Sequence, residues 1–334
     1  MKKYPFLLLA IFGLLIEFSA GAEEKTTYRS ELDIVYGTVE GRELKLNAFL
    51  PADAIKPVPA IVEIHGGWWY GGDSAKKVED VGGHRVFMHR GLAIFSIQYR
   101  LGQAGGFPEN IRDCRNAIRF IRQNAKRFNI DAELIDVTGF SAGGHLSAML
   151  ARVPEDFADG GPLPGLEGVS ARVSGSFSHN LPTDLARFWN QGPDDTVTYA
   201  DGTVTFRPVD AQIRCDSHPR LRILFHGITP DTEEHRALYD QMCPIGHIRK
   251  NIPPILICDG EKDPVVPGLH CKALYAALKA VGADATYWMS ANGGHGFPSG
   301  EGFTKVLDGF IERTLISNSK SEAHSAGQEA PNRR

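Results

Sequence analysis

Residues 139–143 have the pattern Gly-Phe-Ser-Ala-Gly, in which Ser141 stands between two glycines. An apolar-rich segment at 134–138 precedes the pattern and predicts a buried strand, while Leu146 and Leu150 follow at helical spacing. A Gly-x-Ser-x-Gly pattern between a strand and a helix is typical of a nucleophile elbow, a sharp turn that presents the serine hydroxyl above a sheet. Ser141 is therefore the candidate nucleophile for acyl transfer, and the following helix directs its N-terminus toward it.

A serine hydroxyl becomes a strong nucleophile only when a base takes its proton, and that base is usually a histidine oriented by a carboxylate. His295 lies among glycines after the last predicted strand, and Asp263 lies in a loop after another predicted strand. The chain order Ser141, Asp263, His295 is that of an α/β-hydrolase. We therefore expect these residues to form a catalytic triad. Asp259 and Glu261 are alternatives for the acid, and Asp263 is preferred.

A glycine-rich loop at 65–73 follows a predicted strand at 59–65 and contains the run His-Gly-Gly-Trp-Trp-Tyr-Gly-Gly-Asp. Nucleophilic attack on an ester carbonyl develops negative charge on oxygen, and fixed backbone N–H groups stabilise that charge. The loop is typical of the HGGG-type oxyanion loop of lipases and esterases. Its aromatic residues Trp68, Trp69 and Tyr70 are candidate substrate contacts, because aromatic rings suit acyl chains and sugar rings alike. The alternative is that all three pack into the core.

Strands alternate with helices over most of the chain, which predicts a mostly parallel sheet covered on both faces. We expect an α/β-hydrolase fold: an opening hairpin at 31–50, a mostly parallel central sheet flanked by helices, and a small inserted cap. The cap is expected at about 180–251 and includes a predicted β-hairpin at 196–206. Sites in such sheets form at the carboxyl ends of strands. Four loops in these positions carry polar residues among glycines: 65–73, 139–143, 259–267 and 290–297.

The two ends of the chain differ in composition from the middle. Basic residues precede an apolar run at 6–16, and the small residues that end at Ala22 fit the signal-peptidase rule. A membrane anchor is the alternative, but this run is shorter than the roughly 20 residues that span a bilayer. We therefore expect a signal peptide at 1–22 that is cleaved after Ala22, an α/β-hydrolase domain at 23–316 and a disordered polar tail at 317–334. The expected location is secreted or periplasmic, without stable membrane insertion.

Composition limits the class of partner. The chain has 334 residues, a net charge of −4 and 42% hydrophobic residues, which is ordinary for a globular protein with a large core. A mildly acidic chain gives no reason to expect nucleic acid as a partner. Neither Cys-x-x-Cys nor His-Glu-x-x-His occurs in the sequence, so no metal and no cofactor are expected.

Two further sets of residues have a structural interpretation. Four of the arginines on a predicted helix at 109–128 are interpreted as a solvated face: Arg112, Arg115, Arg119 and Arg122. The sequence does not assign disulfide pairs among the five cysteines: Cys114, Cys215, Cys243, Cys258 and Cys271. Cys114 and Cys258 fall in predicted elements and are interpreted as small core residues.

Five motifs together resemble the hormone-sensitive-lipase-like α/β-hydrolases, and more narrowly the bacterial carbohydrate esterases related to acetylxylan and feruloyl esterases. They are HGGWWYGGD at 65–73, YRL at 99–101, GFSAGGHL at 139–146, GEKDPVVP at 260–267 and GGHGF at 293–297. The resemblance covers about 33–315 and implies the triad Ser141, Asp263 and His295. It also implies an oxyanion hole made of three backbone N–H groups, those of Gly67, Trp68 and Ala142. A segment at about 190–225 is longer than these esterases usually carry.

These features predict a secreted serine carboxylic-ester hydrolase that works through an acyl-enzyme. The expected substrates are small-molecule or carbohydrate esters with short acyl groups, acetate above all. Two alternatives remain at this point. One is a peptidase or amidase of the same fold, and the other is a catalytically silent hydrolase scaffold that acts as a binding protein. Such scaffolds typically lose a member of the triad, whereas all three residue types are present here.

Overall fold

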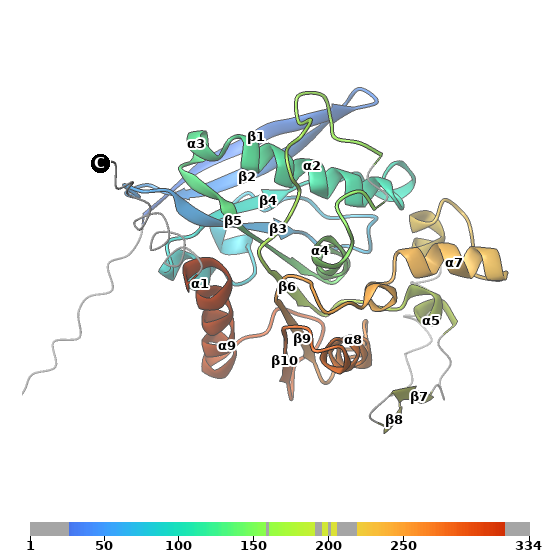
Figure 1. The fold of residues 1–334 in the computed structure, drawn as a ribbon. Coiled ribbons are helices and arrows are strands. Elements are labelled where there is room, and N and C mark those ends of the chain that lie inside the picture. Colours follow the sequence, from blue (N-terminus) through green and yellow to red (C-terminus); the bar gives the residue numbers. More distant parts are fainter. Residues whose placement is uncertain (1–26, 158–159, 191–195, 200–201, 206–218, 318–334) are drawn as a thin grey trace, which may run out of the picture.

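The computed structural model describes residues 27–157, 160–190, 196–199, 202–205 and 219–317 (Figure 1). Its central element is an eight-stranded sheet with the order β1-β2-β4-β3-β5-β6-β9-β10. The strands are β1 (Tyr28–Val39), β2 (Arg42–Pro51), β3 (Val58–Ile64), β4 (Ala93–Ile97), β5 (Ile130–Phe140), β6 (Ser176–His179), β9 (Ile255–Gly260) and β10 (Ala285–Ser290). Strand β2 pairs antiparallel with β1 and β4, and the other pairs in this sheet are parallel. The predicted opening hairpin and mostly parallel sheet are confirmed.

Helices cover both faces of this sheet (Figure 1). They are α1 (His84–His89), α2 (Glu109–Gln123), α3 (Ala125–Phe128), α4 (Ala142–Arg152), α5 (Leu185–Asn190), α7 (Glu233–Gln241), α8 (Leu269–Ala280) and α9 (Glu301–Ile311). Shorter turns are η1 (Val78–Asp80), η2 (Gly102–Ala104), η3 (Pro244–His247) and the π-helical η4 (Glu312–Ile316). Side chains of α2 and α4 pack into one core cluster, and those of α1 and α9 pack into another on the opposite face. The chain therefore has the layered α/β architecture that the alternation of elements predicts.

Strand β9 shows why the sequences of the central strands are unbroken runs of apolar residues. Ile255 and Ile257 pack against α8, whereas Leu256 and Cys258 point to the other face and pack with residues of α9. All four residues are fully buried. A parallel strand that is covered on both faces needs apolar side chains at successive positions, because each face of the strand meets a layer of helices.

The arginines of α2 do not form a solvated face, so that interpretation is wrong. Arg115 and Arg119 are only 2% and 5% exposed. The Arg115 guanidinium donates hydrogen bonds to the carbonyls of Pro154 and Phe157, and Arg119 Nε donates to the Val169 carbonyl at 3.1 Å. The loop after α4 lies across the helix, and its buried carbonyl groups need donors that its own backbone does not supply. Long cationic side chains of the helix provide them.

The predicted cap at 180–251 contains α5, α7 and η3. It also contains strands β7 (Thr196–Tyr199) and β8 (Gly202–Thr205), which pair antiparallel in a small sheet of their own. This confirms the predicted hairpin. Thr232 caps α7, because its side chain accepts a hydrogen bond from the His235 N–H. Side chains at 190–218 lie outside the described residues.

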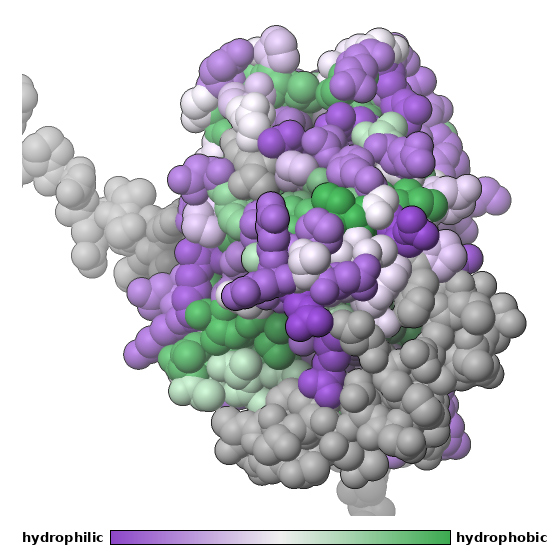
Figure 2. Space-filling model, turned by 90° about the vertical axis from the view of Figure 1, so that its right-hand side faces the viewer, coloured by the Kyte–Doolittle hydropathy of each residue, from purple (hydrophilic) through white to green (hydrophobic). Residues whose placement is uncertain are grey.

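The predicted signal peptide at 1–22 and residues 318–334 of the predicted tail lie outside the described residues. In the described part of the chain, no helix is long and apolar enough to cross a bilayer. The side of the molecule that carries α7 presents mainly hydrophilic residues, with hydrophobic residues near one edge and also near the middle of the face (Figure 2).

Four of the five cysteines lie within the described residues, and these four are buried and free: Cys114, Cys243, Cys258 and Cys271. Burial raises the pKa of each of these thiols, so the thiolate form is disfavoured. They act as small core residues, as predicted for Cys114 and Cys258. Cys215 lies outside the described residues.

Candidate active site

The elbow around Ser141 is a strained turn between β5 and α4. Ser141 has φ 56° and ψ −118°, a backbone conformation that residues with a side chain rarely adopt. Two glycines make the turn possible. A Cβ atom on Gly139 would lie 2.3 Å from the Gly143 backbone, and one on Gly143 would lie 1.9 Å from the Ile64 carbonyl oxygen. The turn therefore packs directly against the end of β3.

Three predicted residues from separate loops meet at the carboxyl ends of the strands. Ser141 Oγ lies 3.1 Å from His295 Nε2, and His295 Nδ1 lies 2.7 Å from Asp263 Oδ2. The Asp263 side chain is fully buried, whereas that of His295 is 17% exposed. Because a carboxylate only accepts hydrogen bonds, Nδ1 must donate to it, and Nε2 is then free to accept from the serine hydroxyl. This tautomer suits a base that takes the proton of Ser141.

The two alternative acids lie elsewhere. Asp259 is 1% exposed, and its carboxylate accepts from the Tyr287 hydroxyl instead of from His295. Burial raises the pKa of Asp259 to about 7. Glu261 points to solvent. Of the three carboxylates considered from the sequence, the structure places Asp263 next to the histidine.

The glycine-rich loop after β3 forms a left-handed turn beside the elbow. Gly67, Trp68 and Trp69 have φ angles of 109°, 58° and 57°, and the N–H groups of Tyr70 and Gly71 both donate to the Gly67 carbonyl. A Cβ atom on Gly67 would lie 2.2 Å from the Gly71 carbonyl oxygen, so the turn requires glycine there.

Three N–H groups of the expected oxyanion hole are available to a ligand. Those of Gly67 and Trp68 donate no hydrogen bond to any group in the described residues, and neither does that of Ala142, the first residue of α4. The loop and the elbow are in contact, because a Cβ atom on Gly66 would lie 3.4 Å from Ser141 Cβ. The loop that carries Gly67 and Trp68 therefore lies beside the candidate nucleophile.

The three aromatic residues of the loop have different surroundings. Trp69 is 2% exposed in the core and meets His145 edge-on with ring centroids 5.1 Å apart, so its expected role as a substrate contact is wrong. Trp68 is half-buried and stacks on Phe188 with ring centroids 5.8 Å apart. Tyr70 is 59% exposed. Consecutive residues with a left-handed backbone direct neighbouring side chains apart. The ring of Trp69 is therefore buried, while that of Tyr70 lies in solvent.

Several histidines near the site are structural. His65 Nδ1 donates to the Gly66 carbonyl at 2.7 Å, and its ring stacks on Tyr99, which fixes the start of the loop. Burial lowers the pKa of His145 to about 4 and that of His179 to about 3. Both are therefore neutral at physiological pH, which leaves His295 as the histidine that bonds to the serine.

Sequence reasoning missed His179 and Asn180 at the end of β6. His179 packs edge-on against Phe297 with ring centroids 4.7 Å apart, and Asn180 Nδ2 lies 2.7 Å from Asp263 Oδ2. A signal was present: His179 and Asn180 directly follow a strand-like segment at 171–178, as polar residues follow the strands at the other site loops. The irregular pattern that begins at residue 180 hid it.

A cavity of about 360 Å³ opens beside His295. Glu63 of β3, His179 of β6 and Gly66 of the oxyanion loop border it. Its lining, as far as the structure describes it, includes three carboxylates, those of Glu63, Asp73 and Asp80, and neither lysine nor arginine. Glu63 Oε2 accepts from the Ser96 hydroxyl, and burial raises the Glu63 pKa to about 7.

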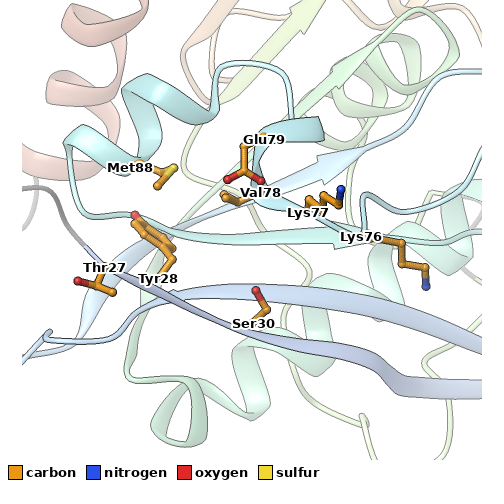
Figure 3. Close-up of a pocket in the computed structure, with 8 residues that line it drawn as sticks. All are labelled: Thr27, Tyr28, Ser30, Lys76, Lys77, Val78, Glu79 and Met88. Carbon is orange, nitrogen blue, oxygen red and sulfur yellow. The ribbon is translucent and has the colours of Figure 1, made fainter.

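A second cavity, of about 380 Å³, lies between β1 and the η1 segment (Figure 3). Its residues include Tyr28, Lys76, Lys77 and Glu79, and none of the candidate site residues lines it. The segment around η1 contributes residues to both cavities: Asp80 lines the cavity beside His295, and Glu79 lines this second one. The Glu79 carboxylate therefore lies near the cavity beside His295 but not in it.

The fold and this site together define an α/β-hydrolase fold with a serine, a histidine and an aspartate in contact at the carboxyl ends of its strands. The chain belongs to the BD-FAE family, whose pattern matches residues 46–278. The resemblance to hormone-sensitive-lipase-like carbohydrate esterases that the motifs indicate is confirmed.

Individual relatives agree with this assignment. Esterase LipC of Mycobacterium tuberculosis is 26% identical over 254 residues, which cover 72% of this chain and 54% of LipC. A truncated carbohydrate esterase from gut microbiota is 26% identical with a TM-score of 0.69, over 87% of this chain and 98% of that one. The butyrate-bound esterase 2 of Thermogutta terrifontis is 25% identical with a TM-score of 0.63, over 88% and 96% of the two chains. The chain spans about half the length of the curated relatives it matches.

Proposed function

We propose that this protein hydrolyses carboxylic esters through an acyl-enzyme formed on Ser141. The observation that carries the proposal is the continuous set of hydrogen bonds from Ser141 Oγ through the His295 ring to Asp263. His295 Nε2 takes the hydroxyl proton as Oγ attacks the ester carbonyl carbon. The same nitrogen then gives that proton to the departing alcohol oxygen as the C–O bond breaks.

Negative charge on the carbonyl oxygen is stabilised by the N–H groups of Gly67, Trp68 and Ala142. Water then enters, His295 takes one of its protons, and the resulting hydroxide attacks the acyl carbon. Collapse of this second tetrahedral intermediate releases the carboxylic acid, and His295 returns the proton to Ser141 Oγ. Removal of one oxyanion donor typically costs a factor of about 10² to 10³ in kcat.

We place the alcohol part of the substrate in the cavity beside His295, because the leaving oxygen must come within hydrogen-bond reach of Nε2. Carboxylates accept hydrogen bonds from hydroxyl groups, so the residues of this cavity suit a polyhydroxylated alcohol such as a sugar. The similarity to a carbohydrate esterase from gut microbiota supports the same substrate class. The described lining contains three carboxylates and neither lysine nor arginine, which favours neutral over anionic sugars.

We infer that the acyl group is short, from acetate to butyrate. The similar esterase of Thermogutta terrifontis holds butyrate, which supports this range. A series of p-nitrophenyl esters should show kcat/KM falling steeply beyond about eight acyl carbons, as expected for a pocket of limited size. Release of acetate from acetylated xylan tests the sugar claim separately. Activity on small esters with none on any acylated sugar would leave the esterase claim intact and remove the carbohydrate claim.

Labelling with a fluorophosphonate probe tests the nucleophile directly. The wild-type protein should react at one serine, and Ser141→Ala should not react and should lose nearly all esterase activity. A binding scaffold without catalysis would not react in either form. Parallel panels of esters and amides with the same acyl group separate an esterase from a peptidase or amidase.

We also propose that residues 1–22 are a signal peptide that directs the protein out of the cytoplasm. The proposal is supported by the apolar run and by the small residues that end at Ala22. N-terminal sequencing of the protein recovered from the periplasm or medium of an expressing bacterium should give Glu23 as the first residue. Recovery of uncleaved protein from the cytoplasm alone would contradict this proposal.

A further inference from the structure

Asn180 directly follows β6 and is fully buried beside the candidate triad. Its backbone is left-handed, with φ 51°, and its N–H donates to the Cys258 carbonyl on β9 at 2.8 Å. The carbonyl of the preceding residue, His179, accepts from the Ser141 N–H at 3.0 Å. Backbone hydrogen bonds to both β9 and the elbow therefore fix the position of this asparagine.

The side-chain amide of Asn180 bonds to both loops that carry the acid and the base. Nδ2 lies 2.7 Å from Asp263 Oδ2 and 3.4 Å from the carbonyl oxygen of Gly294, the residue before His295. The amide oxygen has no partner among the described residues. The reverse orientation of the amide would set two acceptor oxygens against each other at the same short distance, so the nitrogen must face the carboxylate.

Asp263 accepts four hydrogen bonds, two on each oxygen. Oδ2 accepts from Asn180 and His295, both at 2.7 Å, and Oδ1 accepts from the N–H groups of Val265 at 2.8 Å and Val266 at 3.0 Å. A carboxylate has about four acceptor positions, and all are used here. The four donors together therefore fix the orientation of the Asp263 carboxylate.

We propose that Asn180 is a positioning residue that acts through Asp263. Its amide holds the carboxylate turned toward His295 Nδ1, and its bond to Gly294 sets the spacing between the acid and the loop of the base. Asn180 does not touch the reacting atoms. The proposal rests on the proposed function, in which Ser141, His295 and Asp263 carry out the chemistry.

Replacement of Asn180 by glycine is the first test, because glycine tolerates the left-handed backbone and removes only the amide. Loss of a hydrogen bond to a charged group predicts a decrease in kcat of about 10- to 100-fold on p-nitrophenyl acetate, with KM within about twofold. Asn129→Gly is the matched control. Asn129 is also left-handed, with φ 54°, and its Nδ2 donates to the Ala54 carbonyl at 2.8 Å, away from the site. The control should keep the wild-type kcat.

The isosteric variant Asn180→Asp supplies a readout that a purely structural role would not move. Two carboxyl groups and His295 would then share protons, and the extra negative charge favours the imidazolium form. Activity then requires a higher pH, so the acid limb of the kcat/KM profile should move upward by at least about half a unit. If Asn180→Gly does not fold, the pH profile of Asn180→Asp alone tests the proposed role of Asn180.

The outcomes separate the two proposals. Wild-type kcat and an unchanged pH profile in the Asn180 variants, with Ser141→Ala inactive, would overturn the role of Asn180. Activity that survives Ser141→Ala would overturn the proposed function instead. A decrease in kcat in Asn180→Gly that Asn129→Gly does not share, together with the shifted profile of Asn180→Asp, supports a positioning role.

Discussion

The hydroxyl of Tyr287 lies 2.9 and 3.0 Å from the two carboxylate oxygens of Asp259. The two residues lie on the neighbouring strands β10 and β9, and this contact ties Asp259 to the sheet. Asp263 lies four positions further along the chain, in the loop where His295 Nδ1 reaches it at 2.7 Å. Two carboxylates that are close in sequence therefore have different hydrogen-bond partners. Asp259 bonds to a tyrosine on the neighbouring strand, whereas Asp263 bonds to the histidine of the candidate site.

Amide variants of these two aspartates should separate their roles. Asp263→Asn should lower kcat by about 10³- to 10⁴-fold, because an amide no longer holds His295 in the tautomer that accepts the serine proton. Asp259→Asn keeps its bond to Tyr287 and should leave kcat within about threefold. Steady-state kinetics on p-nitrophenyl acetate measure both. A larger loss in Asp259→Asn than in Asp263→Asn would mean that the acid has been misassigned.

The carboxylate of Glu63 should control which sugar esters are accepted. Its pKa is raised to about 7, so it is mainly ionised at pH 8 and mainly neutral at pH 6. At pH 8, Glu63→Gln should raise the ratio of kcat/KM for an acetylated uronate over an acetylated neutral sugar by about 3- to 10-fold, because about 1 kcal/mol of charge repulsion is removed. The gain should shrink at pH 6.

Glu79→Gln is the control for this experiment, because Glu79 lines the separate cavity in Figure 3. It should leave the ratio for the two sugar esters at the wild-type value at both pH values. Equal changes in the two variants would mean that the overall charge of the protein, and not the cavity beside His295, decides the preference.

Asp136 should make stability depend on pH. It is 1% exposed on β5, its only hydrogen bond among the described residues is from the Thr314 hydroxyl at 2.6 Å, and burial raises its pKa to about 7. The unfolded value is about 3.9, so the folded state binds more protons between pH 4 and 7, and the free energy of unfolding falls as pH rises through that window. Asp136→Asn should therefore stabilise the protein at pH 8 by more than about 1 kcal/mol.

Urea unfolding at pH 4.5 and pH 8 measures this effect. The stabilisation of Asp136→Asn relative to wild type should be largest at pH 8 and clearly smaller at pH 4.5, where the folded wild-type carboxyl group is protonated. A stabilisation that is the same at both pH values would show that ionisation of Asp136 is not its cause.

The two adjacent aromatic residues Trp69 and Tyr70 should behave in opposite ways. Trp69→Ala opens a cavity in the core and should lower the free energy of unfolding by about 3–5 kcal/mol. Tyr70 is 59% exposed, so Tyr70→Ala should change stability by no more than about 0.5 kcal/mol. Denaturant titration gives both values, and similar losses in the two variants would contradict the burial seen here.

The sequence by itself determined the fold class and the region of the nucleophile. These signals are local: glycines flank Ser141 where side chains would collide with the elbow backbone or with β3, and apolar runs mark strands that are covered on both faces. Because the loops after parallel strands gather at one edge of a sheet, the order of Ser141, Asp263 and His295 along the chain also predicts that they meet. The hairpin of β1 and β2 was equally predictable, since alternation and a short turn suffice to define it.

The tertiary structure decided which neighbour serves which role. The choice between Asp259 and Asp263 depends on Tyr287 and His295, which lie more than twenty residues further along the chain and become neighbours only when the sheet forms. The burial of Trp69 depends on a left-handed backbone, and that of Arg115 on a loop that crosses its helix. Asn180 lies 83 residues from Asp263. Contacts of this kind leave no periodic pattern in the sequence. Each of these residues suits its own strand, helix or loop no better than many other residue types would, so the sequence around it does not reveal its distant partner.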